Sequence, residues 1–426
     1  MEKLKKIFSD SLKHELITGS IYVFIGGTIS SLLAFFLNIY FARSLTYQEY
    51  GTFSALLSMV TLLTIPSASL SAIIARYATM FFARNENARA GAFYFKSFKA
   101  LLIFSISLNI VFLLLFPFIS EFLKINQLGL IILVAISVAI FYLATLNMSF
   151  IQSLLKFKLL GLIHTLASVG KLISGVVLVF LGFNVYGALL ATLAFSLIDF
   201  VLSIIPLRKV IKNRGKDVNI GTRNFTKYAI PTTIAIFSLS SFISSDVLLV
   251  KHYFTPAEAG LYGGLALVGR VVFYFTGPIV VAMFPLIVKK HSTGEKYKNL
   301  FYMSLLLVIG SSLLITAFYF IFPEFTIKIF LGGKGYLLMT PYLGLFGIFL
   351  TLFSINNVFI NFFLSIKKTF VSWIVLVMAM TQIALIFYFH KDFYQIIYVS
   401  IFTSLLLLTS LVLYYLKIYG LNYARK

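Results

Sequence analysis

The sequence predicts an all-α polytopic membrane protein with about twelve transmembrane helices, arranged as two six-helix lobes. The first observation is composition: 60% of the 426 residues are hydrophobic and only 11% are charged, whereas a soluble domain carries roughly 25% charged residues. The second is that apolar runs of about 20 residues, each long enough to cross a roughly 30 Å hydrocarbon core, recur along the whole chain. The third is a short loop that occurs twice, half a chain apart.

The apolar runs define the predicted spans, and their connections are too short to hold a separate soluble domain. No cysteine is present, so disulfides and thiolate metal sites are excluded. The predicted spans are residues 18–42, 51–75, 98–119, 128–154, 159–181, 184–207, 226–250, 260–288, 300–322, 338–363, 369–389 and 393–416.

The basic residues are distributed unequally between the two sides of the predicted membrane protein. The formal net charge is +22. With twelve spans, the side that carries both termini holds 27 of the 35 Lys and Arg residues, and the opposite side holds six. This is the positive-inside pattern, so both termini are expected in the cytoplasm and the protein in the cytoplasmic (inner) cell membrane. The excess charge therefore indicates topology and contact with anionic lipids, and it does not indicate a nucleic-acid partner.

The doubled loop reads TYQEYGTF at Thr46–Phe53 and TPAEAGLY at Thr255–Tyr262, 209 positions later. Both copies keep Thr, Glu and Gly at the same places. Threonine is a good helix N-cap, and a glutamate three residues later completes a capping box. Each copy is therefore predicted to start a new helix, although such a turn can also recur by chance.

A second correspondence favours duplication over chance. Asn147 and Lys158 are eleven residues apart, as are Asn357 and Lys368, and the two pairs are displaced by 210 residues. We therefore predict an N-terminal lobe at 1–207, a basic cytoplasmic linker at 208–225 and a C-terminal lobe at 226–426. Six spans per lobe give both lobes the same orientation, related by a pseudo-two-fold axis along the membrane normal. Transporters built this way enclose a central site that is reached alternately from each side.

Motifs of enzymes and of ATP-driven pumps are missing from the sequence. It contains no P-loop, no zinc-protease motif, no nucleophile elbow and no dinucleotide fingerprint. The sequence therefore predicts a secondary transporter rather than an enzyme, with no cofactor. A gradient of H+ or Na+, or the membrane potential, is the expected source of energy.

Charged residues inside the spans are the candidate binding residues. Each costs roughly 2.5–3.5 kcal/mol near a helix centre, so these side chains are expected to face the protein interior or a wet cavity. Lys171 lies near the middle of its span, and Arg270 lies in the outer half of the second lobe. Two deep cations favour an anionic cargo, and both side chains bind phosphate.

Other polar residues inside the spans have two possible roles. Asp199, Asp246 and His164 are candidates for ion coupling, or alternatively for structural charge pairs. Three amides, Asn38, Asn147 and Asn357, are candidate polar residues of the cavity. Intramembrane amides also serve as hydrogen bonds between helices.

Three segments carry a resemblance to a known family: NIYFARSLTYQEYGTFSALLSM, KFKLLGLIHTLASVGKLISGVVLVFLGFNVYGALLA and SDVLLVKHYFTPAEAGLYGGLALVGRVV. They resemble the polysaccharide transporters and the O-antigen and capsule repeat-unit flippases, within the multidrug/oligosaccharidyl-lipid/polysaccharide (MOP) exporter superfamily. The resemblance covers about residues 15–420. It implies flipping of undecaprenyl-pyrophosphate-linked oligosaccharides to the outer leaflet by alternating access, in the synthesis of O-antigen, capsule or exopolysaccharide. It also implies a polysaccharide polymerase and a chain-length regulator as partners, and pyrophosphate binding by basic residues, here Arg270 and Lys171.

Two other functions remain open at this level. An ion-coupled multidrug exporter of the same superfamily would use acidic residues to bind organic cations, and this interior carries cations as well. A polytopic glycosyltransferase or polymerase would have a long outer loop rich in charge. The longest predicted outer loop here, 323–337, is short and carries few charges.

Overall fold

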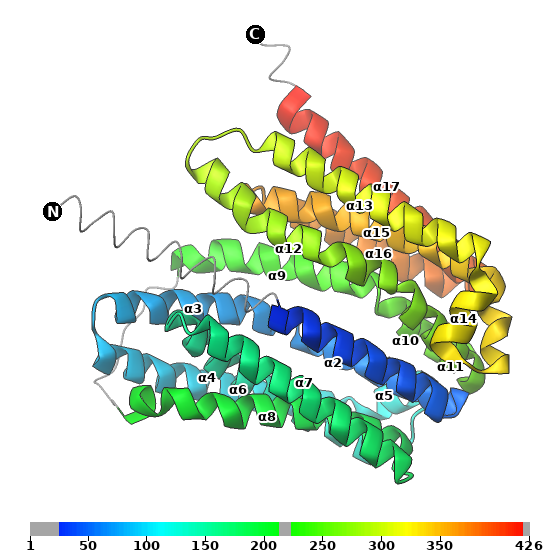
Figure 1. Cartoon of the computed structure of the whole chain (residues 1–426), viewed down its shortest axis with the longest axis horizontal. Helices are drawn as coiled ribbons and strands as arrows, with labels where there is room; N and C mark the ends of the chain where they lie inside the picture. Colours follow the sequence, from blue (N-terminus) through cyan, green and yellow to red (C-terminus); the bar gives the residue numbers. More distant parts are fainter. Residues whose placement is uncertain (1–24, 213–222, 421–426) are drawn as a thin grey trace. The chain divides into compact units, whose positions relative to one another are not determined.

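The computed structural model describes residues 25–212 and 223–420, and every regular element in this part of the chain is helical (Figure 1). Eleven of the described helices are long and apolar enough to span a membrane, or twelve if one bent helix pair counts as a single span. The predicted all-α polytopic membrane fold is therefore confirmed. Residues 1–24 of the predicted first lobe and most of the predicted linker lie outside the described residues.

The helices follow one another with short connections. In chain order they are the span Ile25–Ser44, α2 (Tyr47–Thr64), α3 (Pro66–Ala83), α4 (Asn87–Leu114), α5 (Phe116–Leu123), α6 (Leu128–Ser153), α7 (Phe157–Phe180), α8 (Asn184–Lys212), α9 (Arg223–Phe242), α10 (Ser245–Tyr253), α11 (Pro256–Gly269), α12 (Val271–Ser292), α13 (Lys298–Ile321), α14 (Pro323–Leu331), the 3-10 helix η1 (Lys334–Met339), α15 (Thr340–Ser365), α16 (Val371–Tyr388) and α17 (Phe393–Gly420).

The order and lengths of these elements repeat. The series α2 to α8 and the series α11 to α17 run in parallel, and the short helices α5 and α14 occupy the same place in each. Both short helices end on a left-handed residue, Lys124 (φ 54°) and Gly332 (φ 68°). The repeat that the doubled loop predicts therefore extends along the described chain, with η1 as an addition to the second copy.

The described chain divides into two compact units by its internal contacts. The first unit contains the span Ile25–Ser44 and α3 to α8, and the second contains α2 and α9 to α17. The segment Leu45–Ile65, which contains α2, therefore packs with the second unit although it belongs to the first half of the sequence. The chain returns to the first unit at Pro66, the first residue of α3, which is a favourable position for proline in a helix. The boundaries predicted at residues 207 and 226 concern the two copies of the sequence repeat, not these compact units, and they stay a prediction.

In the first unit, α6 lies at the centre and packs on α3, α4 and α8. Its fully buried Asn147 accepts a hydrogen bond from the Tyr94 hydroxyl of α4 at 2.8 Å and donates to the Ser203 hydroxyl of α8 at 3.0 Å. In the same unit the span Ile25–Ser44 approaches α7 closely. A Cβ atom added at Gly26 would lie 2.9 Å from the Gly161 carbonyl oxygen.

In the second unit, α15 occupies the equivalent central position and packs on α12, α13 and α17. Asn356 of α15 donates to the Ser404 carbonyl oxygen of α17 at 2.9 Å. The internal repeat of the sequence paired Asn147 with Asn357. In the structure it is Asn356 that, like Asn147, bonds to a neighbouring helix. Asn356 also follows Asn147 by 209 residues, the same displacement as the doubled loop. Asn357 instead accepts from the side chain of Asn361 within α15, at 2.7 Å.

The two copies of the doubled loop begin α2 and α11, and both form the predicted capping box. Thr46 and Thr255 each accept from the backbone N–H three residues later, at 3.3 Å in both copies. The Glu49 and Glu258 carboxylates accept in return from the two threonine backbone N–H groups, at 3.0 Å in both copies. The capping prediction is confirmed, and α2 and α11 then pack closely against each other.

Candidate functional site

In the first unit, an imidazole and an ammonium group on α7 lie near an aromatic ring and a carboxylate on α8. His164 and Lys171 are seven residues apart on α7, which places them on one face, two turns apart. Phe195 and Asp199 are four residues apart on α8 and also share a face. The Phe195 ring contacts the His164 imidazole edge-on at 5.2 Å between centroids. The two faces therefore meet at Phe195.

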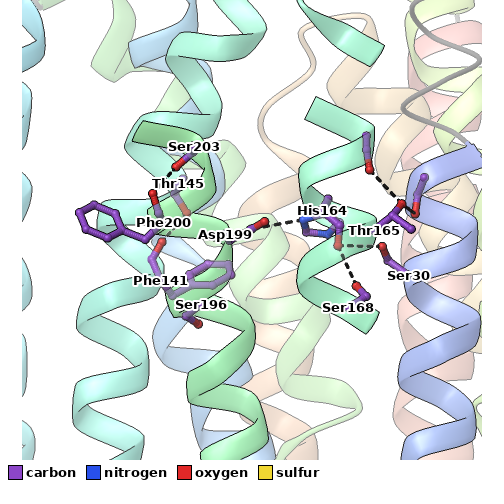
Figure 2. A network of polar contacts seen from close by, with 12 residues as sticks. Ser30, Phe141, Thr145, His164, Thr165, Ser168, Ser196, Asp199, Phe200 and Ser203 are labelled. Atoms are coloured by element: carbon purple, nitrogen blue, oxygen red, sulfur yellow. Dashed lines mark hydrogen bonds and ion pairs between the residues drawn. The ribbon is translucent and has the colours of Figure 1, made fainter. Parts of the chain in front are cut away.

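His164 and Asp199 form a side-chain pair between α7 and α8, with 3.3 Å between His164 Nδ1 and Asp199 Oδ2 (Figure 2). The imidazole side chain is 40% exposed, whereas the carboxylate side chain is only 6% exposed. The second carboxylate oxygen, Oδ1, is buried and has no hydrogen-bond partner among the described residues. A buried charged oxygen without a donor is costly, so this pair holds a carboxylate whose charge is only partly compensated.

The backbone around His164 is fixed by neighbouring hydroxyl groups. Its carbonyl oxygen accepts from Ser168 of the same helix at 3.0 Å and from Ser30 of the span Ile25–Ser44 at 3.3 Å (Figure 2). These bonds fix the backbone from which the His164 side chain extends.

Lys171 is the predicted cation near the middle of its span, and it is partly buried. Its Nζ lies 5.9 Å from the centroid of the Phe195 ring. No hydrogen bond or ion pair joins this ammonium group to any residue in the described ranges. A cation over an aromatic ring gains only about 0.5–2 kcal/mol, which is less than the cost of an unpaired cation in a spanning helix. The charge of the Lys171 ammonium is thus not compensated by a described acid.

A second polar cluster surrounds a helix break in the second unit. The segment Ile230–Phe242 and α10 are bent by 43° against each other. A break leaves backbone carbonyl groups without their usual donors. Side chains from other helices supply them, because Gln382 of α16 donates to the Phe242 carbonyl at 3.3 Å and Arg270 donates to the Ile243 carbonyl. The predicted cargo-binding Arg270 therefore also has a structural contact.

Arg270 itself lies at the junction of α11 and α12. Its positive charge acts attractively on Asp246, in the first turn of α10. Asp246 is fully buried. It accepts a hydrogen bond from the Tyr262 hydroxyl at 2.9 Å and another from the Val247 backbone N–H at 2.8 Å. Asp246 is thus an interior residue of the second unit.

The remaining predicted amides have local partners. Asn38 donates to the Ala34 carbonyl oxygen of its own helix at 2.8 Å, and Asn147 and Asn357 make the bonds described above. Within the described residues, no group of three or more His, Asp or Glu side chains is arranged to hold a metal ion.

The structure thus brings His164, Lys171 and Asp199 together in the first unit, and Asp246 and Arg270 together in the second. Since Lys171 and Arg270 belong to different units, the prediction that they line one cavity stays a prediction. Sequence reasoning missed Phe195 and Tyr262 as site residues, whereas Gln382 is one of the intramembrane amides expected to bond between helices, and it does so. Tyr262 could have been found from the sequence, because it is the aromatic residue that closes the doubled loop. The serine-rich stretch SLSSFISSD lies at the helix break.

Comparison with known proteins gives a family and a fold. A family model described as polysaccharide biosynthesis protein matches residues 40–341, which is more than half of the chain. No curated protein matches by sequence.

Solved structures resemble the chain over nearly its whole length. An inward-facing multidrug resistance MATE family transporter of the MOP superfamily gives a TM-score of 0.72 at 12% identity, covering 90% of this chain and 94% of that one. The lipid II flippase MurJ, in an inward closed conformation, gives 0.70 at 16% identity, covering 93% and 86%. An outward-facing MATE transporter gives 0.63 at 13% identity, covering 94% of both chains. The fold is therefore that of these MATE transporters and of MurJ.

Proposed function

Because this chain belongs to the polysaccharide biosynthesis protein family, we propose that it is a flippase for lipid-linked oligosaccharides. Its cargo is an undecaprenyl-pyrophosphate-linked repeat unit, which it moves from the cytoplasmic to the outer leaflet for the synthesis of O-antigen, capsule or exopolysaccharide. The resemblance of the fold to a lipid II flippase and to multidrug transporters supports movement of a large amphipathic molecule. The positive-inside charge pattern supports a location in the cytoplasmic membrane with both termini inside.

The observation that carries this proposal is the Lys171 ammonium, which no described acid neutralises. A pyrophosphate group supplies the missing negative charge, and an ammonium group binds phosphate as a point charge. Arg270 is the second candidate for the pyrophosphate. Its guanidinium has five N–H donors, so the bond to the Ile243 carbonyl leaves donors for a ligand.

Transport then proceeds by alternating access, with a gradient of H+ or Na+ or the membrane potential as the source of energy. No cofactor takes part, and the protein carries out no chemical reaction. A polysaccharide polymerase and a chain-length regulator act on the delivered repeat units and are the proposed protein partners.

The test is transport of a pyrophosphate-linked oligosaccharide carrying a short polyprenyl chain into proteoliposomes. Lys171→Met removes the charge and should reduce transport at least 10-fold without lowering the melting temperature, whereas Lys171→Arg should retain part of the activity. Lys298→Met is the matched control, because Lys298 also lies over an aromatic ring, that of Tyr419 at 4.1 Å. Transport by Lys171→Met at the wild-type rate would refute the proposed role of this residue.

A further inference from the structure

We propose that the His164–Asp199 pair is a proton-binding site linked to the cargo site, so that binding of an anionic cargo at Lys171 takes up a proton. This inference rests on the proposed function. It adds that the affinity for cargo at this site depends on pH, and it identifies the two residues that make it do so.

The geometry defines two protonation states of the pair. Asp199 Oδ2 accepts from His164 Nδ1, so the neutral imidazole carries its proton on Nδ1 and has a free lone pair on Nε2. The imidazole side chain is 40% exposed, and the proposed second proton binds at Nε2. The pair then changes from a net charge of −1 to zero. Histidine suits this role, because it is the side chain whose charge ordinarily changes between about pH 5 and 8.

The Asp199 carboxylate is the group whose charge the proposed proton would compensate. With Oδ1 buried and without a donor among the described residues, an imidazolium on Oδ2 is the nearby charge that compensates the carboxylate. An ion pair of this kind keeps a buried carboxylate tolerable. In the proposed protonated state the pair is thus an ion pair around a buried carboxylate.

Few other ionisable groups face the pair. Phe195 separates it from Lys171. The two helices themselves carry further titratable residues toward their ends: Lys158 of α7, and Tyr186, Arg208, Lys209 and Lys212 of α8. The span Ile25–Ser44, which packs on α7, contributes Tyr40 and the distant terminal Arg43. The described helices packed on α8 add the following titratable residues: Tyr142 of α6, and Arg89, Tyr94, Lys96 and Lys99 of α4. Tyr94 is already bonded to Asn147.

The sign of the linkage follows from charge. Two turns of α7 separate Lys171 from His164, about 10 Å along the helix. A pair with a net charge of −1 attracts the Lys171 ammonium and repels an anionic ligand bound to it, whereas the protonated pair does neither. Cargo binding therefore favours protonation, and protonation by reciprocity favours cargo binding. Coupling between two such sites is expected to change affinity by about 10-fold.

The experiment measures proton uptake when the purified full chain binds farnesyl pyrophosphate in detergent. Calorimetry at pH 6.5 in two buffers with different ionisation enthalpies gives the number of protons bound. The wild type should take up more protons than His164→Gln, with an excess of up to one. From pH 8 to pH 6 its affinity should rise about 10-fold more than that of the variant. The pyrophosphate itself also changes its protonation over this pH range, with either protein. The linkage is therefore tested only by the difference between the wild type and His164→Gln.

Two further variants complete the test. His164→Gln keeps an N–H donor for Asp199, and Asp199→Asn should abolish the excess uptake independently if His164→Gln does not fold. His291→Gln is the control, because His291 lies at the end of α12 against Tyr297, and it should behave as the wild type. Equal uptake by the wild type and His164→Gln, with binding that still depends on Lys171, would overturn the linkage alone. Binding that is absent, or that is unchanged in Lys171→Met, would overturn both the linkage and the proposed cargo site.

Discussion

Gly51 and Gly260 occupy equivalent positions in the two copies of the doubled loop, and they meet where α2 and α11 cross. A Cβ atom added at Gly51 would lie 2.7 Å from the Gly260 backbone nitrogen. The next equivalent pair, Ser54 and Gly263, also meets, because a Cβ atom at Gly263 would lie 3.1 Å from the Ser54 side chain. When residues contact their own equivalents, the contact lies on a two-fold axis. The α2–α11 crossing is therefore locally two-fold symmetric.

The first prediction concerns this crossing. A Cβ atom at Gly260 would lie 1.7 Å from the Tyr47 carbonyl oxygen, so Gly260→Ala must push the two helices apart. Forced overpacking of this kind costs about 1–3 kcal/mol or more. We expect a clearly lower melting temperature in detergent and a loss of transport.

Gly310→Ala is the control for this prediction. Gly310 lies in α13, and an added Cβ atom there would meet nothing within 4 Å. Alanine stabilises a helix by roughly 0.5–1 kcal/mol relative to glycine, so this variant should melt at the wild-type temperature or slightly above it. Equal melting temperatures for Gly260→Ala and Gly310→Ala would contradict the close crossing.

The second prediction concerns the paired caps. Thr46→Ala and Thr255→Ala each remove one acceptor from the start of a helix, which costs about 1 kcal/mol. Since the two capping boxes have matching distances, the two variants should lose similar stability. Thr409→Ala is the control, because the Thr409 hydroxyl is exposed and bonds to the Leu405 carbonyl of its own helix. A loss in only one of the two cap variants would argue that the repeat is not energetically symmetric.

The third prediction separates the structural role of Arg270 from that of Lys171. Arg270→Ala leaves the Ile243 carbonyl without its donor at the helix break, a loss of about 1–3 kcal/mol. The melting temperature should therefore fall, unlike that of Lys171→Met. Arg270→Lys should recover part of the stability, because the charge near Asp246 remains although the planar guanidinium is lost.

Tyr262→Phe tests the other side of this cluster, because it removes the hydroxyl that donates to Asp246. Combined with Arg270→Ala in a double-mutant cycle, it should show a non-additive effect, since residues around one buried group couple. Strict additivity would separate Arg270 from the Asp246 cluster. Restoration of stability and transport when both Arg270 and Asp246 are neutralised would show that Arg270 is mainly a structural partner of Asp246.

The fourth prediction concerns topology. The chain has no cysteine, so single cysteines at Gln127 and Lys296, both exposed and both in connections between helices, can be labelled without background. In intact cells an impermeant maleimide should react with Gln127→Cys but not with Lys296→Cys, and permeabilisation should expose Lys296→Cys. The reverse pattern would place both termini outside.

The sequence by itself determined the class of the protein. The chain has few charges and many apolar runs long enough to cross a membrane. In lipid, each such run must bond its own backbone N–H and C=O groups, and a helix does so. The capping boxes at Thr46 and Thr255 are local, since each needs only four consecutive residues, and both were predictable. The displacement of 209 residues likewise revealed the repeat without a structure.

Tertiary structure decided which residues meet. No spacing in the sequence assigns the segment Leu45–Ile65 to the second unit, because that depends on two glycines 209 residues apart allowing close approach of α2 and α11. Likewise, Asp199 was recognisable as a costly charge, but its partner His164 lies 35 residues away on another helix. Helix periodicity determines on which face of a helix a side chain lies. Packing between segments that are distant in the sequence determines which other helix contacts that face.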